Sequence, residues 1–236
     1  MKIAFASLSN AGPRPINEDF LDCWTTETGE TVACVADGLG GMGGGDVASK
    51  LAVTRFREKL LNGAGSESSM LEAAQSAHQA ILDAQDSSTR NRMATTLTAV
   101  ALRDDKLWGV HCGDSRAVIA RGRGIKRLTT DHSEGQRLFE AGKISKEELA
   151  DYPRKHILES ALGHRDDPRI ETFQFDLHPG DRVILTTDGV HNIVSLHQMQ
   201  ILASTSLGPD ELVNRVATTI AEEGAADNYS LIALFA

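Results

Sequence analysis

The chain has 236 residues, of which 41% are hydrophobic and 24% charged, a composition typical of a globular protein with a substantial core. Its formal net charge of -9 argues against a broad electrostatic grip on nucleic acid or on an anionic membrane. No signal peptide is visible, and no apolar run reaches the roughly 18 residues that a bilayer-spanning helix needs. Three cysteines lie far apart in the sequence, at Cys23, Cys34 and Cys112. This spacing is typical of thiols in a reducing compartment, so we expect a cytoplasmic protein.

The first half of the chain predicts strands, then a glycine-rich turn and two helices, then strands again. The expected strands are 2–8, 20–25 and 31–36, the turn is 38–45, the helices are 47–61 and 69–85, and a strand-rich block spans 95–128. Asp46 is expected to cap the first helix because a side-chain oxygen at that position accepts from free backbone N–H groups.

The second half opens with a polar, helical segment, 131–157, whose low apolar content indicates an appended surface element. The elements expected after it are strands 170–177 and 181–187, helices 195–204 and 209–223, and a final strand 229–235. Strands follow one another in hairpin-like succession and helices come in pairs, which predicts antiparallel sheet covered by helices, an α+β fold. No linker divides the chain, so we expect a single domain over residues 1–236.

Three predicted strands share one pattern, an apolar run with an aspartate next to one of its ends. Asp37 and Asp188 each follow such a run, and Asp227 precedes one. A single Asp-Gly or Asp-Asn pair is an ordinary turn. Three carboxylates at the ends of buried strands favour a cation site if they converge, since like charges would otherwise force some of them to protonate. Oxygen ligands favour Mg2+ or Mn2+ over zinc, although convergence does not follow from the spacing.

A further charged group lies near the N-terminus, in Arg14-Pro15-Ile16-Asn17-Glu18-Asp19. A proline turn with solvated charges is the favoured explanation when this segment is considered alone. The alternative is functional: Arg14 offers a planar fork for a phosphate, and Glu18 and Asp19 offer oxygens to water on a metal.

Other catalytic patterns fit less well. Gly38-Leu-Gly40-Gly-Met-Gly43 matches the glycine fingerprint of a dinucleotide site, but Asp37 would repel a pyrophosphate there. His111-Cys112 lacks the arginine of a cysteine-dependent phosphatase loop, because Val118 stands six residues after the cysteine. No GxSxG sequence is present, and His132 is the histidine that merits most attention.

Nine short motifs, taken in chain order, are more specific than any one of them. They are Arg14-x-x-Asn17-Glu18-Asp19, Val35-Ala-Asp37-Gly38-Leu-Gly40-Gly41, Gly45-Asp46-x-Ala48-Ser49, Thr95-Thr96, Gly113-Asp114-Ser115-Arg116, Leu128-Thr-x-Asp131-His132-Ser133, Ala161-Leu162-Gly163, Thr187-Asp188-Gly189 and Asp227-Asn228. Together they span nearly the whole chain. The sequence resembles the metal-dependent protein phosphatases of the protein phosphatase 2C family in their compact bacterial form.

The resemblance implies a four-layer α-β-β-α sandwich with two metals at one end and a flap near 131–157. Asp37 would bridge both ions, and the Gly38 carbonyl would bind one of them. Asp188 and Asp227 would complete the second ion's ligands, while Glu18 and Asp19 would act through water. The resemblance further implies a weaker third ion on Asp114 with Asp188, phosphate orientation by Arg14, and supporting roles for Asn228 and Thr95-Thr96. The sequence departs from the family at Leu39, Met42, Ala94 and Glu159-Ser160.

The expected activity is hydrolysis of phosphoserine and phosphothreonine on proteins, with Mg2+ or Mn2+ as cofactor. A hydroxide between the two ions would attack phosphorus directly, without a phosphoenzyme. The expected partners are phosphorylated proteins and a serine/threonine kinase whose signalling the enzyme opposes, and a monomer is expected. Two alternatives stay open: a catalytically silent module that binds phosphoproteins, which turnover of a phosphopeptide would exclude, and a nucleotide-binding enzyme, which a dinucleotide binding assay would reveal.

Overall fold

The structure is a computed structural model that describes residues 1–236 apart from 41–42, 64 and 87–92. Within this part of the chain, the strands form two five-stranded sheets in which every neighbouring pair is antiparallel. The first sheet has the order β1 (Ala4–Asn10), β10 (Tyr229–Phe235), β9 (Arg182–Thr186), β6 (Arg116–Arg121) and β7 (Gly124–Arg127). The second has the order β2 (Asp19–Thr25), β3 (Thr31–Asp37), β4 (Leu97–Arg103), β5 (Lys106–Cys112) and β8 (Glu171–Asp176).

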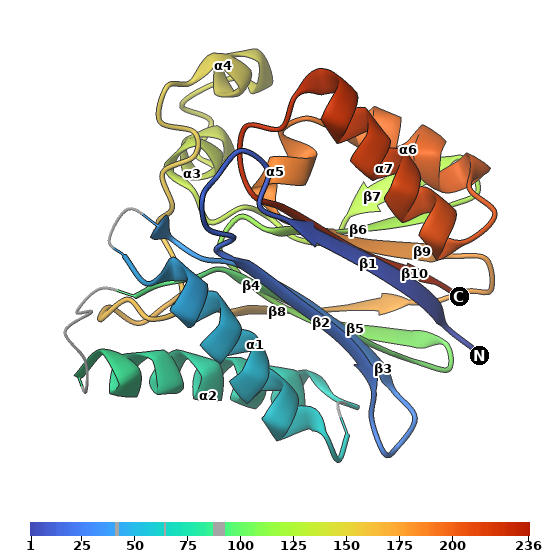
Figure 1. Cartoon of the computed structure of the whole chain (residues 1–236), viewed down its shortest axis with the longest axis horizontal. Helices are drawn as coiled ribbons and strands as arrows, with labels where there is room; N and C mark the ends of the chain where they lie inside the picture. Colours follow the sequence, from blue (N-terminus) through green and yellow to red (C-terminus); the bar gives the residue numbers. More distant parts are fainter. Residues whose placement is uncertain (41–42, 64, 87–92) are drawn as a thin grey trace.

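Helices cover the outer face of each sheet, which gives four layers (Figure 1). α1 (Gly45–Leu60) and α2 (Glu67–Asp86) cover the second sheet. α6 (Leu196–Thr205) and α7 (Pro209–Glu223) cover the first. The predicted α+β sandwich with two antiparallel sheets between helix pairs is therefore confirmed.

Three apolar clusters hold these layers together: one under each helix pair and one between the sheets. α2 shows why its sequence folds this way, because Met70, Ala74, Ala77 and Ile81 recur at helical spacing and are all fully buried. The central strand β3 is buried on both faces, since one face meets the helices and the other meets the first sheet. Its continuous apolar sequence reflects that double burial.

The start of α1 differs from the prediction. The helix begins at Gly45 rather than Val47, and Asp46 lies in its first turn instead of capping it. Gly44 occupies the capping position with φ of 98°, a left-handed conformation that glycine adopts without steric cost, and no side chain caps the helix. The expectation that Asp46 is the cap is therefore wrong.

The segment predicted to be polar and helical contains two short helices, α3 (Glu134–Glu140) and α4 (Lys146–Asp151). α4 buries no residue, and a reciprocal pair of hydrogen bonds between Ser145 and Glu148 holds its start. Both helices project beyond the sandwich above the end where β10 begins (Figure 1). We call residues 131–157 the flap segment.

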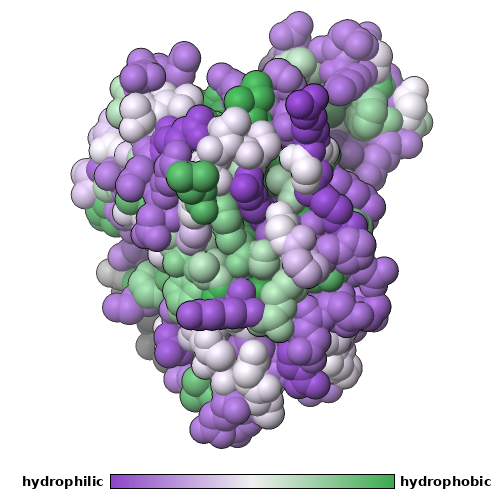
Figure 2. Space-filling model, turned by 90° about the vertical axis from the view of Figure 1, so that its right-hand side faces the viewer, coloured by the Kyte–Doolittle hydropathy of each residue, from purple (hydrophilic) through white to green (hydrophobic). Residues whose placement is uncertain are grey.

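The opposite end of the sandwich carries the two chain ends (Figure 1). Figure 2 shows this side of the molecule: apolar residues gather at its centre and hydrophilic residues surround them. Exposed apolar side chains include Met1 and Phe5, which are 45% and 43% exposed. Among the helices of the described residues, none combines the length and apolar character that crossing a membrane requires.

Candidate metal centre and active site

Strand polarity brings the predicted carboxylates to one end of the sandwich. Asp37 ends β3 and is paired in register with Asp19, the first residue of β2. Asp188 follows β9, and Asp227 precedes β10, its antiparallel neighbour. Asp114 lies in the turn between β5 and β6. Antiparallel neighbours present opposite chain ends at the same edge, which pairs Asp19 with Asp37 and brings Asp188 near Asp227. Stacking of the two sheets then places Asp37 and Asp227 in one pocket, although they are 190 positions apart.

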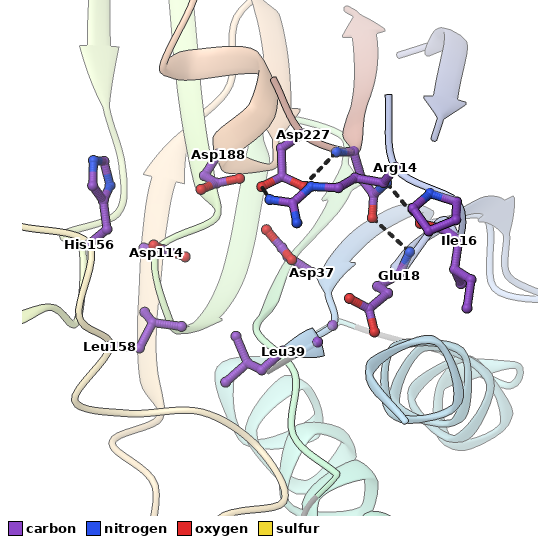
Figure 3. A pocket seen from close by; sticks show the side chains of 14 residues that line it. Arg14, Ile16, Glu18, Asp37, Leu39, Asp114, His156, Leu158, Asp188 and Asp227 are labelled. Atoms are coloured by element: carbon purple, nitrogen blue, oxygen red, sulfur yellow. Dashed lines mark hydrogen bonds and ion pairs between the residues drawn. The ribbon is translucent and has the colours of Figure 1, made fainter. Parts of the chain in front are cut away.

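These carboxylates line one pocket of about 480 Å3 (Figure 3). Asp37, Asp114, Asp188 and Asp227 all contribute to its wall. Figure 3 shows the Asp37 and Asp188 carboxylates in this same pocket. The convergence that the sequence spacing leaves open is therefore present for these two residues.

Threonine side chains from the start of β4 fix the backbone at Asp37. The Asp37 N–H donates to Thr96 Oγ1 at 2.9 Å, and the Thr95 hydroxyl donates to the Asp37 carbonyl at 2.9 Å. Thr96 Oγ1 lies 2.8 Å from Ser115 Oγ, and both residues are fully buried. The expected support by Thr95-Thr96 therefore acts on the main chain, which leaves the Asp37 carboxylate free for other partners.

Gly38 is required by a close backbone approach. A Cβ atom there would lie 2.2 Å from the Gly45 carbonyl oxygen and 2.7 Å from the Glu18 carbonyl oxygen. Its N–H donates to that Glu18 oxygen at 3.1 Å. Gly38 thus lets the start of α1 and the Glu18 segment pack against the end of β3.

Asn228 ties the N-terminal arm to the start of β10. Its Oδ1 accepts from the Glu18 N–H at 2.8 Å, and its Nδ2 donates to the carbonyls of Ala11 and Ile16 at 2.8 and 3.1 Å. A buried amide with this many partners positions backbone rather than binding a ligand. The segment carrying Arg14 and Glu18 is thereby held against Asp227.

Arg14 and Glu18 reach the pocket from this arm (Figure 3). Arg14 Nη2 lies 2.8 Å from Asp227 Oδ2, and both side chains are about half exposed. The Glu18 carboxylate occupies the space in front of Gly40 and Gly45, where a Cβ atom would collide with it. Burial, followed by the charge of Asp46, raises the pKa of Glu18.

Asp19 lies behind the pocket wall and is 5% exposed. Its Oδ2 accepts from the Thr187 hydroxyl at 2.8 Å, whereas its Oδ1 is buried and has no hydrogen-bond partner among the described residues. Burial raises the pKa of this carboxyl to about 7, and the charges of Asp188 and Asp227 add to the shift. An orphaned carboxylate oxygen at this depth is costly unless a cation or its water satisfies it.

Burial and neighbouring negative charge destabilise the charged forms of three aspartates in the pocket, Asp37, Asp114 and Asp188. Burial raises the pKa of Asp37 well above its usual range, and the charges of Asp19, Asp188, Asp114 and Asp227 raise it further. Burial and the charge of Asp188 raise the pKa of Asp114 to about 7. Burial and the charge of Asp227 raise the pKa of Asp188. Cations between these groups would remove both penalties.

The donor set fits hard divalent cations, since five carboxylates and several carbonyls supply oxygen, while His156 is the one histidine among the lining residues and no cysteine is among them. Among the described residues, no group of three or more histidine, cysteine, aspartate or glutamate side chains is arranged to hold a metal on its own. A site of two carboxylates per ion is completed by main-chain carbonyls and water, which Mg2+ in particular retains. The orphaned Asp19 oxygen is consistent with such water.

Sequence reasoning missed two residues of the pocket wall. His156 and Leu158, from the end of the flap segment, line the pocket (Figure 3). His132, the histidine singled out from the sequence, is instead buried in a ring contact with His111 at 4.6 Å between centroids. No local pattern marks His156, because its place depends on how the flap segment returns to the sandwich. Met42 falls outside the described residues.

Comparison with known proteins places this site in a family. Residues 13–228 match the family model for protein phosphatase 2C, so the chain belongs to the protein phosphatase 2C family. It is a protein-serine/threonine phosphatase, as its named relatives are.

Three of these relatives illustrate the likeness. The serine/threonine phosphatase stp of Listeria welshimeri is 30% identical over 228 residues, covering 92% of this chain and 88% of the relative. The solved S. agalactiae serine/threonine phosphatase is 27% identical with a TM-score of 0.91, covering 99% of each chain. The catalytic domain of the phosphatase PstP, solved in complex with two manganese ions, is 26% identical with a TM-score of 0.85, covering 99% of this chain and 97% of that one.

Proposed function

We propose that this phosphatase hydrolyses phosphoserine and phosphothreonine on proteins with the help of two divalent cations, Mg2+ or Mn2+. The observation that carries the proposal is the convergence of Asp37, Asp188, Asp227 and Asp114 in one pocket, where burial and then neighbouring negative charge raise the pKa of Asp37, Asp114 and Asp188. The manganese ions in the related PstP structure support the same reading.

Each residue has a proposed part in holding these ions. Asp37 would hold both ions, and the Gly38 carbonyl, Asp188 and Asp227 would supply the remaining protein ligands. Glu18 and Asp19 act through water, for which the unpartnered Asp19 oxygen is the supporting observation. Asp114, facing Asp188 across the pocket, holds a third and weaker ion with it (Figure 3).

Divalent cations bound here would lower the pKa of a water and offset the charge of the phosphoryl oxygens, which permits direct attack on phosphorus. The protein's own part is orientation. Arg14 uses Nη2 for Asp227, and its remaining N–H donors are available to the phosphate oxygens without loss of that ion pair. Because the guanidinium is half exposed, it meets the phosphate as the substrate enters.

The biological setting belongs to the proposal as well. The substrates are phosphorylated proteins, and the enzyme opposes a serine/threonine kinase in bacterial signalling as a cytoplasmic monomer. The free cysteines support a reducing compartment, since Cys34 and Cys112 are buried thiols whose pKa burial raises.

Metal removal tests the function. A phosphothreonine peptide and p-nitrophenyl phosphate should both be hydrolysed with Mn2+, and the rate should fall to the uncatalysed level after chelation and return on adding Mn2+. Turnover that persists unchanged in excess chelator would contradict the proposal. Peptide binding without turnover would instead identify a catalytically silent module.

Arg14→Ala should raise KM for phosphorylated substrates about tenfold with a smaller change in kcat, because charge-assisted hydrogen bonds contribute about 1.5–3 kcal/mol and this one is partly exposed. Steady-state kinetics with p-nitrophenyl phosphate measure both constants. Arg55→Ala is the matched control, because Arg55 is similarly exposed and pairs only with Glu58 on α1 within the described residues. An unchanged KM in Arg14→Ala would argue against phosphate orientation.

Stability of the metal-free protein should fall as pH rises from 5 to 8. The folded-state pKa values of Asp19 and Asp114 are about 7 against an ordinary 3.8, so their contribution is full below about pH 3.8 and is lost as pH passes 7. Mn2+ should therefore raise Tm more at pH 8 than at pH 5; at a hundredfold excess over Kd the full gain is about 2.7 kcal/mol. Thermal unfolding with chelator or Mn2+ checks this, and an equal gain at both pH values would count against it.

A further inference from the structure

A second pocket, of about 310 Å3, lies beside the active-site pocket under the flap segment. Three residues, Asp114, His156 and Asp188, line both pockets. The two spaces are therefore neighbours across a shared wall. A peptide whose phosphorylated residue enters the first pocket has its adjacent residues within reach of the second, because an extended chain advances only about 3.3 Å per residue.

Positive charge dominates the wall of this second pocket away from the shared residues. Arg116 and Arg127 both bind the single carboxylate of Asp131, at 2.6 Å for Arg116 Nη2 and 2.8 Å for Arg127 Nη2. Two guanidinium groups on one carboxylate leave one positive charge in excess. Lys155 adds a second, because the partner of its ammonium group is the neutral carbonyl of Ala150.

The excess positive charge shifts the pKa values of Arg127 and Asp131. Burial lowers the pKa of Arg127, and repulsion by Arg116 adds to that shift against the opposing attraction of Asp131. Burial alone would raise the pKa of Asp131, but the two arginines outweigh it and hold the pKa below its usual range. Both arginine side chains are less than a third exposed, so they have lost much of their hydration. An entering anion would restore favourable interactions that water supplies poorly there.

This concentration of positive charge contrasts with a chain whose formal net charge is -9. The active-site pocket next to it has five carboxylates and one arginine in its wall, whereas the second pocket has three cationic side chains and three carboxylates, two of them shared with the first pocket. Arg116, Arg127 and Lys155 are therefore the cationic groups beside the active-site pocket that can attract an anionic side chain.

We infer that the second pocket binds an anionic side chain of the substrate, a carboxylate or a second phosphate, within about three residues of the phosphorylated residue. The inference rests on the proposed function and adds a substrate preference to it: phosphoproteins whose modified serine or threonine lies in an acidic or multiply phosphorylated segment. Carboxylate and phosphate share the chemistry that guanidinium and ammonium groups recognise.

Phosphothreonine peptides that differ only in the residues flanking the phosphothreonine test this. The flanking residues are glutamate, phosphothreonine, alanine or lysine, and kcat/KM is measured for each with Mn2+. The wild type should prefer the two anionic peptides over the alanine peptide by about fivefold, the size of a partly exposed charge pair, and should disfavour the lysine peptide. The better of the two anionic peptides identifies the source of the anion.

Charge reversal at Lys155 connects the preference to the pocket. Lys155→Glu should abolish the preference for anionic peptides and favour the lysine peptide, while Lys155→Gln should remove most of the preference without reversing it. Lys143→Glu is the matched control, because it makes the same charge change on an exposed part of the flap segment outside the pocket lining. Its preference should stay that of the wild type.

Hydrolysis of p-nitrophenyl phosphate separates this inference from the proposed function, because that substrate has no flanking residue. All variants should hydrolyse it within about twofold of the wild type, a smaller change than the expected peptide preference. Equal wild-type rates on all four peptides would overturn the inference while leaving the phosphatase proposal intact. A preference that survives Lys155→Glu as fully as it survives Lys143→Glu would overturn the assignment to this pocket.

Discussion

Asp37→Asn is expected to lower kcat/KM about a thousandfold or more while making the metal-free protein more stable. The loss follows because a bridging ligand serves both proposed cations, whose charge stabilisation is worth several kcal/mol at 1.36 kcal/mol per tenfold. The gain follows because four nearby carboxylates and burial oppose the charged form of Asp37, and asparagine removes that charge at nearly the same volume. We expect about 1–3 kcal/mol, the range for an unsatisfied buried polar group.

Kinetics with saturating Mn2+ and urea unfolding in chelator measure the two effects. Asp105→Asn is the control, because Asp105 is exposed in the turn between β4 and β5 and should change neither quantity. An Asp37→Asn protein that keeps wild-type activity would remove the basis of the proposed mechanism. If Asp37→Asn instead destabilised the metal-free protein, repulsion between the pocket carboxylates would not be the main effect that opposes its folding.

Gly189→Ala is expected to damage both the fold and the site. A Cβ atom on Gly189 would lie 1.9 Å from the Asn228 carbonyl oxygen and 2.9 Å from its carbonyl carbon, so backbone must move. The segment after β9 that carries Asp188 and the segment before β10 that carries Asp227 are in contact at this point. Relief of the clash separates the two carboxylates, and we expect at least about 3 kcal/mol of destabilisation, the upper end of the usual cost of overpacking.

Urea unfolding and Mn2+ affinity by calorimetry measure this pair of effects. Gly208→Ala is the matched control, since a Cβ atom there has no neighbour within 4 Å and its extended backbone accepts any residue. It should cost about 1 kcal/mol at most, the usual loss when alanine replaces a better residue at a helix N-cap, and it should leave Mn2+ affinity unchanged. A Gly189→Ala protein with wild-type stability and wild-type Mn2+ affinity would disprove the backbone contact.

The sequence predicts most of the fold because its periodicities are strong. The final strand, expected at 229–235, has those bounds in the structure, as does α7 at 209–223. Both are long apolar patterns, and α7 begins at Pro209 and is followed by Gly224, residues favoured at those positions. α5 (Asp188–His191) was not predicted because four residues are too few to display a helical period.

Some site residues can likewise be predicted from local sequence, whereas others depend on the three-dimensional fold. Asp37 and Asp188 were marked by their place at the mouths of apolar strands, which is local information. Their proximity depends on which strands are neighbours and is not encoded in spacing. The same holds for His156, which reaches the pocket through the fold of the flap segment, and for Gly38, whose need for glycine comes from Gly45 seven residues away.

Anomalous diffraction from a crystal soaked in Mn2+ tests the central claim most directly. We expect two strong peaks at the Asp37 carboxylate, one of them also within coordination distance of Asp188 and Asp227, and a weaker third beside Asp114. A crystal that binds Mn2+ elsewhere, or that shows no peak at Asp37 under conditions where the enzyme is active, would contradict a two-cation mechanism.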